Sequence, residues 1–124
     1  MLRPKGENVF LATVIVSVLF AVLLIVSAGG KFTGQEMQMA TMRKVGFPVD
    51  KVWLLACAEL AGAGGLALGL FWWPLGAAAG AGLVAYFIGA AGSHVRAGDQ
   101  RGMGGAVLLL VLAVAALTLR AVTS

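Results

Sequence analysis

The sequence predicts an all-α integral membrane protein, an antiparallel bundle of four transmembrane helices with a short interfacial helix between spans one and two. Two observations lead to this fold class. Hydrophobic residues make up 60% of the 124 residues and charged residues only 11%, whereas soluble domains are about half apolar and about a quarter charged. The apolar residues also gather into four runs, each near the roughly 20 residues that a helix needs to cross a bilayer.

This composition excludes a soluble globular protein, a disordered chain and a secreted domain held by disulfides. Four spans take up about 80 residues, so we expect a single domain over residues 1–124 without a separate soluble catalytic module. The net charge of +4 does not indicate a nucleic-acid partner, because the basic residues are scattered and form no patch or stripe. The lipid bilayer is therefore the first partner that the sequence predicts.

The first span is predicted over residues 9–28, after a polar tail over residues 1–8. Its many β-branched residues would favour a strand in water, but a segment in lipid must satisfy its own backbone, which favours a helix. We expect a retained span rather than a cleaved signal, because the apolar run is long for a signal peptide. Gly29 and Gly30 are predicted to end the helix, and Lys31 to reach the membrane interface.

The polar connection over residues 31–51 contains a helix-compatible segment, residues 35–45. We expect this segment to form a short helix at the membrane surface or over the mouth of the bundle. Thioethers can bind a soft metal ion, but adaptable packing is the stronger interpretation of the methionines in this segment. These methionines are Met37, Met39 and Met42.

The other three spans are predicted over residues 52–70, 75–91 and 103–122. Trp72 and Trp73 lie where an aromatic belt is expected, and Pro74 suits the first turn of a helix. Spans two and three are rich in small residues, which let helices approach closely in lipid. Two pairs have GxxxG spacing, Gly65 with Gly69 and Gly76 with Gly80. Tight packing within one bundle is the simpler interpretation, and a homo-oligomer through Gly/Ala helix faces is the alternative.

Glu59 is the charged residue that lies deep inside a predicted span. It follows about eight residues after the start of that span, about 11 Å from the loop side at 1.5 Å per residue. A carboxylate that faces hydrocarbon is costly, so Glu59 should face the bundle interior. We consider it a candidate ligand-binding residue and a candidate catalytic acid or base. A purely structural contact that fixes the helix register is the alternative.

Helix counting places four other polar residues in the same leaflet as Glu59 or at its edge. They are Lys31, His94, Arg96 and Asp99. We therefore predict a polar mouth with Glu59 at its floor, and all five residues are candidate ligand-binding residues. His94 is the second catalytic candidate, while interfacial flanks are the alternative interpretation of Lys31, Arg96 and Asp99.

The sequence gives little support for a metal or haem site or for a redox-active disulfide. No metal-binding motif appears, and the one histidine cannot supply a bis-histidine haem site within one chain. The single cysteine, Cys57, excludes thiol–disulfide chemistry within the chain. Cys57 lies two residues before Glu59 and so on another face of the helix, and we expect it to be a buried small hydrophobic residue.

The order of several motifs resembles the DoxX-like family, small four-helix membrane proteins related to DoxX and DoxD. Residues 53–76 resemble the second and third helices of that family, with Glu59 at the matching place. The segment from His94 to Asp99 is similar to the family's His-x-Arg-x-Gly-Asp ending. Gly29-x-Lys31 and Gly46-Phe47-Pro48 match as well, so that the resemblance extends over residues 9–122.

The resemblance implies a multi-pass protein of the bacterial inner membrane. One relative is the small subunit of a thiosulfate:quinone oxidoreductase, and others are linked to oxidative-stress complexes. A quinone is therefore the candidate cofactor and an oxidoreductase the candidate partner. If a quinone binds, Glu59 and His94 are the residues that would exchange protons with its ring oxygens.

We thus expect a small membrane subunit or accessory of a quinone-linked or oxidative-stress redox system, with a lipophilic ligand in a polar pocket around Glu59. Two alternatives remain open. One is a structural or assembly protein without a ligand. The other is a stand-alone enzyme that acts on a lipophilic substrate with Glu59 as acid or base, so the sequence leaves open whether the chain is an enzyme.

Overall fold

The computed structural model describes residues 5–123, which form helices and short connections. In chain order the elements are α1 (Lys5–Phe32), α2 (Glu36–Lys44), the 3-10 helix η1 (Val49–Lys51), α3 (Val52–Leu68), α4 (Trp73–Arg96) and α5 (Gln100–Val122). Four helical segments, over Glu7–Phe32, Val49–Leu68, Trp73–Arg96 and Gly102–Val122, are long and apolar enough to cross a membrane. The all-α bundle of four membrane helices that the sequence predicted is therefore confirmed.

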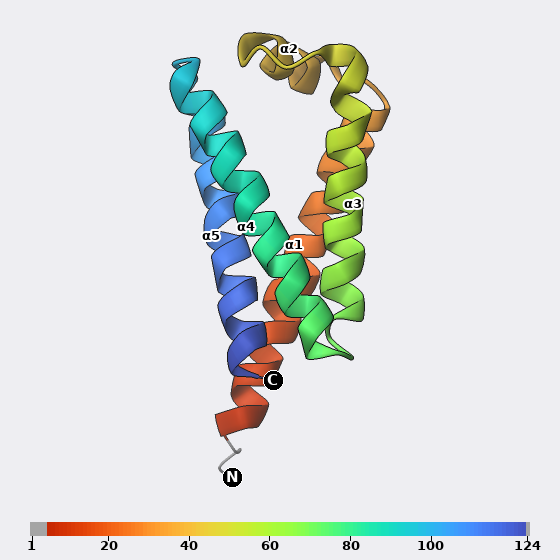
Figure 1. Cartoon of the computed structure of the whole chain (residues 1–124), viewed down its shortest axis with the longest axis vertical. Coiled ribbons are helices and arrows are strands. Elements are labelled where there is room, and N and C mark those ends of the chain that lie inside the picture. The colour runs from red at the N-terminus through yellow and green to blue at the C-terminus, as the bar shows by residue number, and fades with distance from the viewer. Residues whose placement is uncertain (1–4, 124) are drawn as a thin grey trace.

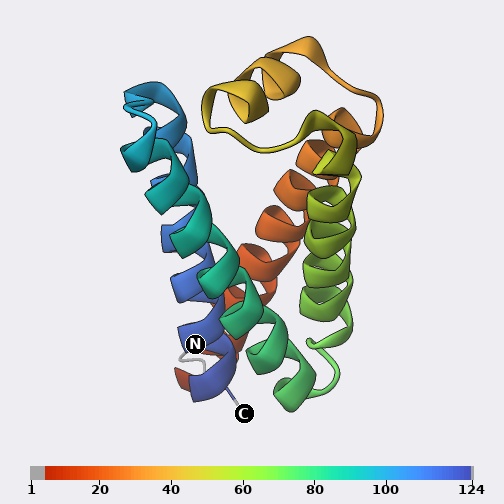
Figure 2. The ribbon, with the colours of Figure 1, turned by 45° about the horizontal axis from the view of Figure 1, so that its top comes forward.

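The four long helices form two pairs, which meet at one end and diverge at the other (Figure 1). Helix α1 packs along α3, and α4 packs along α5, in the two most extensive helix contacts of residues 5–123. The pairs come together near the α3–α4 turn, and α2 lies across the end where they diverge (Figure 2). The divergent end is the loop side, where the sequence places most of its polar residues.

Small residues allow the two pairs to meet closely at the α3–α4 turn. A Cβ atom added at Gly69 would collide with the backbone of Gly76, and one at Gly65 would lie 2.7 Å from the Cβ atom of Ala79 on α4. Within the other pair, a Cβ atom at Gly80 would lie 3.0 Å from the Leu117 backbone. These close contacts favour glycine. All four glycines with GxxxG spacing therefore serve packing within the chain, while a homo-oligomer through other Gly/Ala faces stays a prediction.

The apolar core lies where the two pairs converge. Phe20 and Leu24 of α1 and Phe87 of α4 are buried there, and the rings of Phe20 and Phe87 have centroids 6.0 Å apart. Many large apolar side chains outside this core are exposed, among them Ile15 and Leu108. An apolar surface of this extent requires a non-aqueous surrounding, which agrees with helices that face lipid.

The start of α1 differs from the sequence prediction. Residues 5–8 are helical and not part of a polar tail, while residues 1–4 of that predicted tail lie outside the described part of the chain. Glu7 lies in the first turn of the helix. A negative charge there interacts favourably with the partial positive charge of the helix N-terminus, which helps the helix to extend past the apolar run.

Helices α1 and α4 also end later than predicted. Helix α1 continues through Gly29 and Gly30 to Phe32, and α4 continues past residue 91 to Arg96. Continued backbone hydrogen bonding outweighs the roughly 1 kcal/mol that a glycine costs inside a helix. As a result, side chains in the last turns of both helices point back toward the N-terminus of their helix.

Helix α2 confirms the predicted short helix within residues 35–45 and covers the divergent end of the bundle. Its methionines do not converge, because Met39 is buried whereas Met37 is 77% exposed. The prediction for Cys57 is wrong, since this residue is exposed on α3. The buried residues of α3 recur every three or four positions and include Ala56 and Glu59, so Cys57 falls outside the buried stripe.

Candidate functional site

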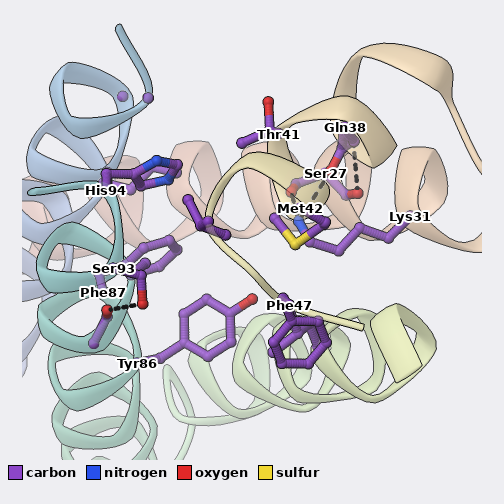
Figure 3. Close-up of a pocket in the computed structure, with 18 of the residues that line it drawn as sticks. Ser27, Lys31, Gln38, Thr41, Met42, Phe47, Tyr86, Phe87, Ser93 and His94 are labelled. Carbon is purple, nitrogen blue, oxygen red and sulfur yellow. Dashed lines mark hydrogen bonds between the residues drawn. The ribbon is translucent and has the colours of Figure 1, made fainter. Parts of the chain in front are cut away.

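A cavity of about 580 Å³ lies between the two helix pairs, with α2 contributing to its wall. Its lining is mostly apolar, with polar side chains from α1, α2, α3 and α4 (Figure 3). The polar residues that matter most below are Ser27, Lys31, Gln38, Glu59, Tyr86 and His94. Pockets of about 300 to 1,000 Å³ with a few placed polar groups are typical of small-molecule sites.

Lys31 and Glu59 form a buried ion pair at this cavity. The Lys31 Nζ and Glu59 Oε1 atoms are 2.9 Å apart, and the two side chains are 8% and 1% exposed. Lys31 also donates hydrogen bonds to Ser27 Oγ at 2.8 Å and to Gln38 Oε1 at 3.1 Å. The ammonium group therefore links α1, α2 and α3 at a single point.

The direction of helical side chains explains how Lys31 reaches this point. Side chains on a helix point back toward its N-terminus, so a lysine in the last turn of α1 lies beside Ser27, one turn earlier. The expectation that Lys31 reaches the membrane interface is wrong, because its side chain is buried against Glu59. Because α1 continues through Gly30 instead of ending there, the side chain of Lys31 turns into the bundle.

The Glu59 carboxylate is only partly satisfied by this pair. In the described part of the chain, Oε1 is buried and has no hydrogen-bond donor, because the ammonium approaches it without hydrogen-bond geometry. A buried polar atom without a hydrogen bond costs about 1 to 3 kcal/mol, and more when it is charged. Glu59 thus places a buried and incompletely satisfied carboxylate at the wall of the cavity.

His94 and Asp99 form a second polar contact, on the opposite helix pair. Nδ1 of His94, in the last turn of α4, lies 3.0 Å from Oδ2 of Asp99, and both residues are buried. Asp99 is the N-cap of α5, where its Oδ1 accepts from the Gly102 backbone N–H at 3.2 Å. Lys44 Nζ of α2 reaches the same oxygen at 3.4 Å, so this contact also ties α2 to the α4–α5 turn.

The surroundings of Asp99 keep it ionised. The hydrogen bond from the Gly102 N–H lowers the pKa of Asp99 most, and contacts with His94 and Lys44 lower it further, against the opposing effect of burial. An ionised carboxylate only accepts hydrogen bonds. His94 must therefore carry its proton on Nδ1 when it bonds to Asp99, and in the neutral imidazole Nε2 is then an acceptor.

The structure brings the five predicted site residues together in part. Lys31, Glu59, His94 and Arg96 line the cavity, while Asp99 contacts His94 but does not line the cavity itself. Arg96 is exposed. In residues 5–123 no contact joins Glu59 to His94, so the expected polar mouth consists of two separate clusters on opposite walls.

Sequence reasoning did not identify three lining residues, Ser27, Gln38 and Tyr86. The hydroxyl group of Tyr86 points into the space between the helices (Figure 3). Helical spacing gave a usable signal, because Tyr86 precedes His94 by two turns and Ser27 precedes Lys31 by one turn. Gln38 carried no such signal, since its position depends on how α2 folds over the bundle.

Comparison with known proteins adds one positive finding. A family model described as the DoxX-like family matches residues 15–116, a range that includes both polar clusters. No curated protein and no solved structure matches the chain. The family match agrees with the motif resemblance and with a small membrane protein.

Proposed function

The chain belongs to the DoxX-like family, and on this premise we propose that it binds a lipophilic molecule in the cavity around Glu59. The observation that supports this proposal most is the buried carboxylate of Glu59 at the cavity wall. The side chain is 1% exposed, lines a cavity of about 580 Å³, and accepts no hydrogen bond from the described residues beside its ion pair with Lys31. A bound molecule that donates to this carboxylate would recover part of the cost of burying it.

The position of the cavity determines the character of the ligand. The cavity extends between the spanning helices and has an apolar wall that includes Leu55, Phe87 and Leu109. Its two polar clusters lie toward the loop side. A molecule with an apolar body and a polar end fits this distribution, because each part would meet a matching surface.

We further propose that the protein is a subunit or accessory of a quinone-linked or oxidative-stress redox system in a bacterial inner membrane. The residues present fit a quinone, because carboxylate and imidazole groups line the polar end of a cavity with an apolar wall. When bound, a quinone would carry electrons to or from a partner oxidoreductase. In this account Glu59 and His94 exchange protons with the ring oxygens, and Lys31 lies beside the carboxylate as its ion-pair partner.

A structural function is the second candidate, and the Lys31–Glu59 ion pair supports it. The pair joins α1 to α3, and Lys31 also reaches α2, so Glu59 would then serve only to fix the positions of these elements. A stand-alone enzyme with Glu59 as acid or base is the third candidate. It predicts turnover of a lipophilic substrate by the purified chain alone, which Glu59→Gln would abolish while the protein stays folded.

Mass spectrometry of small molecules that co-purify in mild detergent tests the proposal. The wild type is compared with Glu59→Gln and with Glu36→Gln, a matched control whose carboxylate is exposed on α2. We expect a stoichiometric quinone or isoprenoid with the wild type and the control, and its loss with Glu59→Gln. Bulk phospholipid alone in all three samples, with folded protein, would contradict the proposal and favour the structural function.

A further inference from the structure

A groove on the outer side of α3 and α4 adjoins the cavity at Tyr86, which lines both. We infer that this groove holds the hydrocarbon chain of the ligand, so that the ligand is a lipid with a long flexible chain and not a compact molecule that the cavity encloses alone. This inference rests on the proposed function, because the polar end of the same ligand occupies the cavity.

Helices α3 and α4 separate at the level where the cavity begins. Their close approach extends from the α3–α4 turn to Gly62, where an added Cβ atom would lie 2.6 Å from Cδ2 of Leu83. About one turn nearer to the loop side are Glu59 of α3 and Tyr86 of α4, and both line the cavity. From this level to the loop side the two helices diverge (Figure 1), so the cavity borders a gap between them.

The groove lies against lipid and extends from this gap toward the α3–α4 turn. Its volume is about 330 Å³. From Tyr86 to Ala79 it covers about 10 Å along α4 at 1.5 Å per residue. Ala58, Ala61 and Gly82 are exposed on the outer side of the two helices. Besides Tyr86, the lining residues are Ala58, Ala61 and Gly62 of α3 with Ala79, Gly82 and Leu83 of α4.

A buried polar group lies next to the start of the groove. Glu59 follows Ala58 directly in α3, but its side chain is 1% exposed and lines the cavity. Beside its ion pair with Lys31, the carboxylate accepts no hydrogen bond from the described residues. A polar ligand group in the cavity would lower the cost of burying this carboxylate, whereas the groove offers mainly aliphatic side chains. The two hollows therefore suit the two ends of one amphiphilic molecule.

Tyr86 forms the boundary between the cavity and the groove. Its ring packs edge to face against Phe87, with ring centroids 4.9 Å apart, and Phe87 lines the cavity. The Tyr86 hydroxyl points into the space between the helices (Figure 3). A chain that leaves the cavity for the groove must therefore pass this ring.

The direction of the groove matches the orientation of a lipid in the loop-side leaflet. The polar residues of the cavity lie toward the loop side, and the groove extends from Tyr86 deeper into the bilayer. A membrane lipid likewise has its polar group at the surface and its chain toward the midplane. Continuity with the cavity favours the ligand chain as the occupant over a second copy of the protein, which would cover the groove without using the cavity.

Photocrosslinking with two probes that differ in the position of the label tests the inference. Both are derivatives of 4-dodecylphenol, one with a diazirine beside the ring and the other with a diazirine at the end of the chain. The wild-type protein is labelled in lipid nanodiscs. We expect the first probe to label cavity residues such as Met42 and Leu109, and the second to label groove residues such as Ala61 and Gly82. Excess unlabelled 4-dodecylphenol should prevent both sets of labels.

The two probes separate the inference from the proposed function. If the first probe labels the cavity and the second does not label the groove, the inference is overturned while the proposed function stands. Groove labels that the competitor does not prevent reflect contact with bulk lipid and would overturn the inference as well. If the first probe gives no preventable label in the cavity, the proposed function fails together with the inference.

A variant that fills the groove tests its contribution to binding. An added Cβ atom at Gly82 has nothing within 4 Å, so Gly82→Leu fills the groove without a clash at the helix contact. We expect several-fold weaker binding of 4-dodecylphenol, corrected with empty nanodiscs, and unchanged binding of 4-ethylphenol, whose chain is too short to reach the groove. Gly64→Leu is the matched control, because Gly64 is an exposed glycine with the same open space but outside the groove. Unchanged binding of 4-dodecylphenol to folded Gly82→Leu would overturn the inference.

The mass of the protein in detergent distinguishes the ligand chain from a second copy. Size-exclusion chromatography with light scattering compares the wild type with Gly82→Leu and Gly64→Leu. We expect the same mass for all three proteins. A wild-type dimer that Gly82→Leu alone separates into monomers would overturn the inference, because the groove would then be an interface between copies.

Discussion

Lys31 on α1 and Glu59 on α3 form an ion pair with 2.9 Å between Nζ and Oε1, and both side chains are almost inaccessible. The pair lies at the wall of the cavity and at the place where α1, α2 and α3 meet. The contact joins the two helices of one pair. In the proposed function it also places the Glu59 carboxylate beside the ligand.

Removal of one partner should destabilise the protein strongly. Lys31→Met leaves the Glu59 charge buried without a counter-charge, and we expect a loss of about 3 to 5 kcal/mol in the free energy of unfolding. Unfolding in detergent, followed by circular dichroism, measures this loss. Lys51→Met is the matched control, because Lys51 is exposed on η1, and it should change stability by less than about 0.5 kcal/mol.

The double variant Lys31→Met/Glu59→Met tests the pairing itself. With both charges removed, no buried charge remains uncompensated, so the double variant should be more stable than Lys31→Met alone. Losses that simply add up would show that the two side chains do not act as a pair.

The Asp99 carboxylate should make stability depend on pH in the acid range. Its pKa lies below the usual value of 3.8 because the Gly102 N–H, His94 and Lys44 all favour the ionised form in the folded protein. The resulting stabilisation is complete above that usual value and is lost as the pH falls from there through the lowered pKa. Asp99→Asn should remove this part of the acid sensitivity, and Asp50→Asn should not. Identical acid profiles for wild type and Asp99→Asn would contradict this assignment.

Close packing at the α3–α4 turn should tolerate no side chain at Gly69. Gly69→Ala places a Cβ against the Gly76 backbone, and overpacking of this kind costs about 1 to 3 kcal/mol. Gly64 lies in α3, whose C-cap is Gly69, and has nothing within 4 Å of an added Cβ. Gly64→Ala should therefore be neutral or stabilise the protein by up to about 1 kcal/mol. Equal stabilities of the two variants in thermal unfolding would rule out this packing account.

A buried cation at the converging end should also contribute to stability. Arg120 of α5 is 7% exposed, donates from Nε to the Gly69 carbonyl at 2.8 Å, and lies over the ring of Phe10. Arg120→Met leaves the Gly69 carbonyl without this donor, with an expected loss of about 1 to 3 kcal/mol. The comparison is Arg43→Met, which removes an exposed arginine and should cost less than about 1 kcal/mol. A smaller loss for Arg120→Met than for Arg43→Met would contradict this role.

The sequence predicted the four spans because the apolar runs are long and their interruptions are sharp. It also placed Lys31, Glu59 and His94 on the same side of the membrane, since that result needs only helix counting. The contact between Lys31 and Glu59 was not predictable in this way. It depends on the rotation of α1 relative to α3 and on the continuation of α1 through two glycines.

Residues outside the polar motifs were harder to identify. Cys57 was expected to be buried, but in a membrane bundle an apolar residue is equally stable against lipid, so hydrophobicity does not distinguish the two faces of α3. The partner of Arg120 is not apparent from the sequence, because its acceptor, the Gly69 carbonyl, belongs to a distant turn. The burial of Cys57 and the partner of Arg120 both depend on how the helices pack together. The helices themselves follow from the local sequence.

The proposed function requires that a lipophilic ligand occupies the cavity between the two helix pairs. Photocrosslinking with an alkylphenol that carries a diazirine on its chain, followed by peptide mass spectrometry, locates such a ligand. We expect labels on cavity-lining residues such as Met42, Tyr86 and Leu109, with excess 4-nonylphenol preventing them. Labels confined to exposed residues such as Ile15 and Leu108, unaffected by the competitor, would contradict the claim.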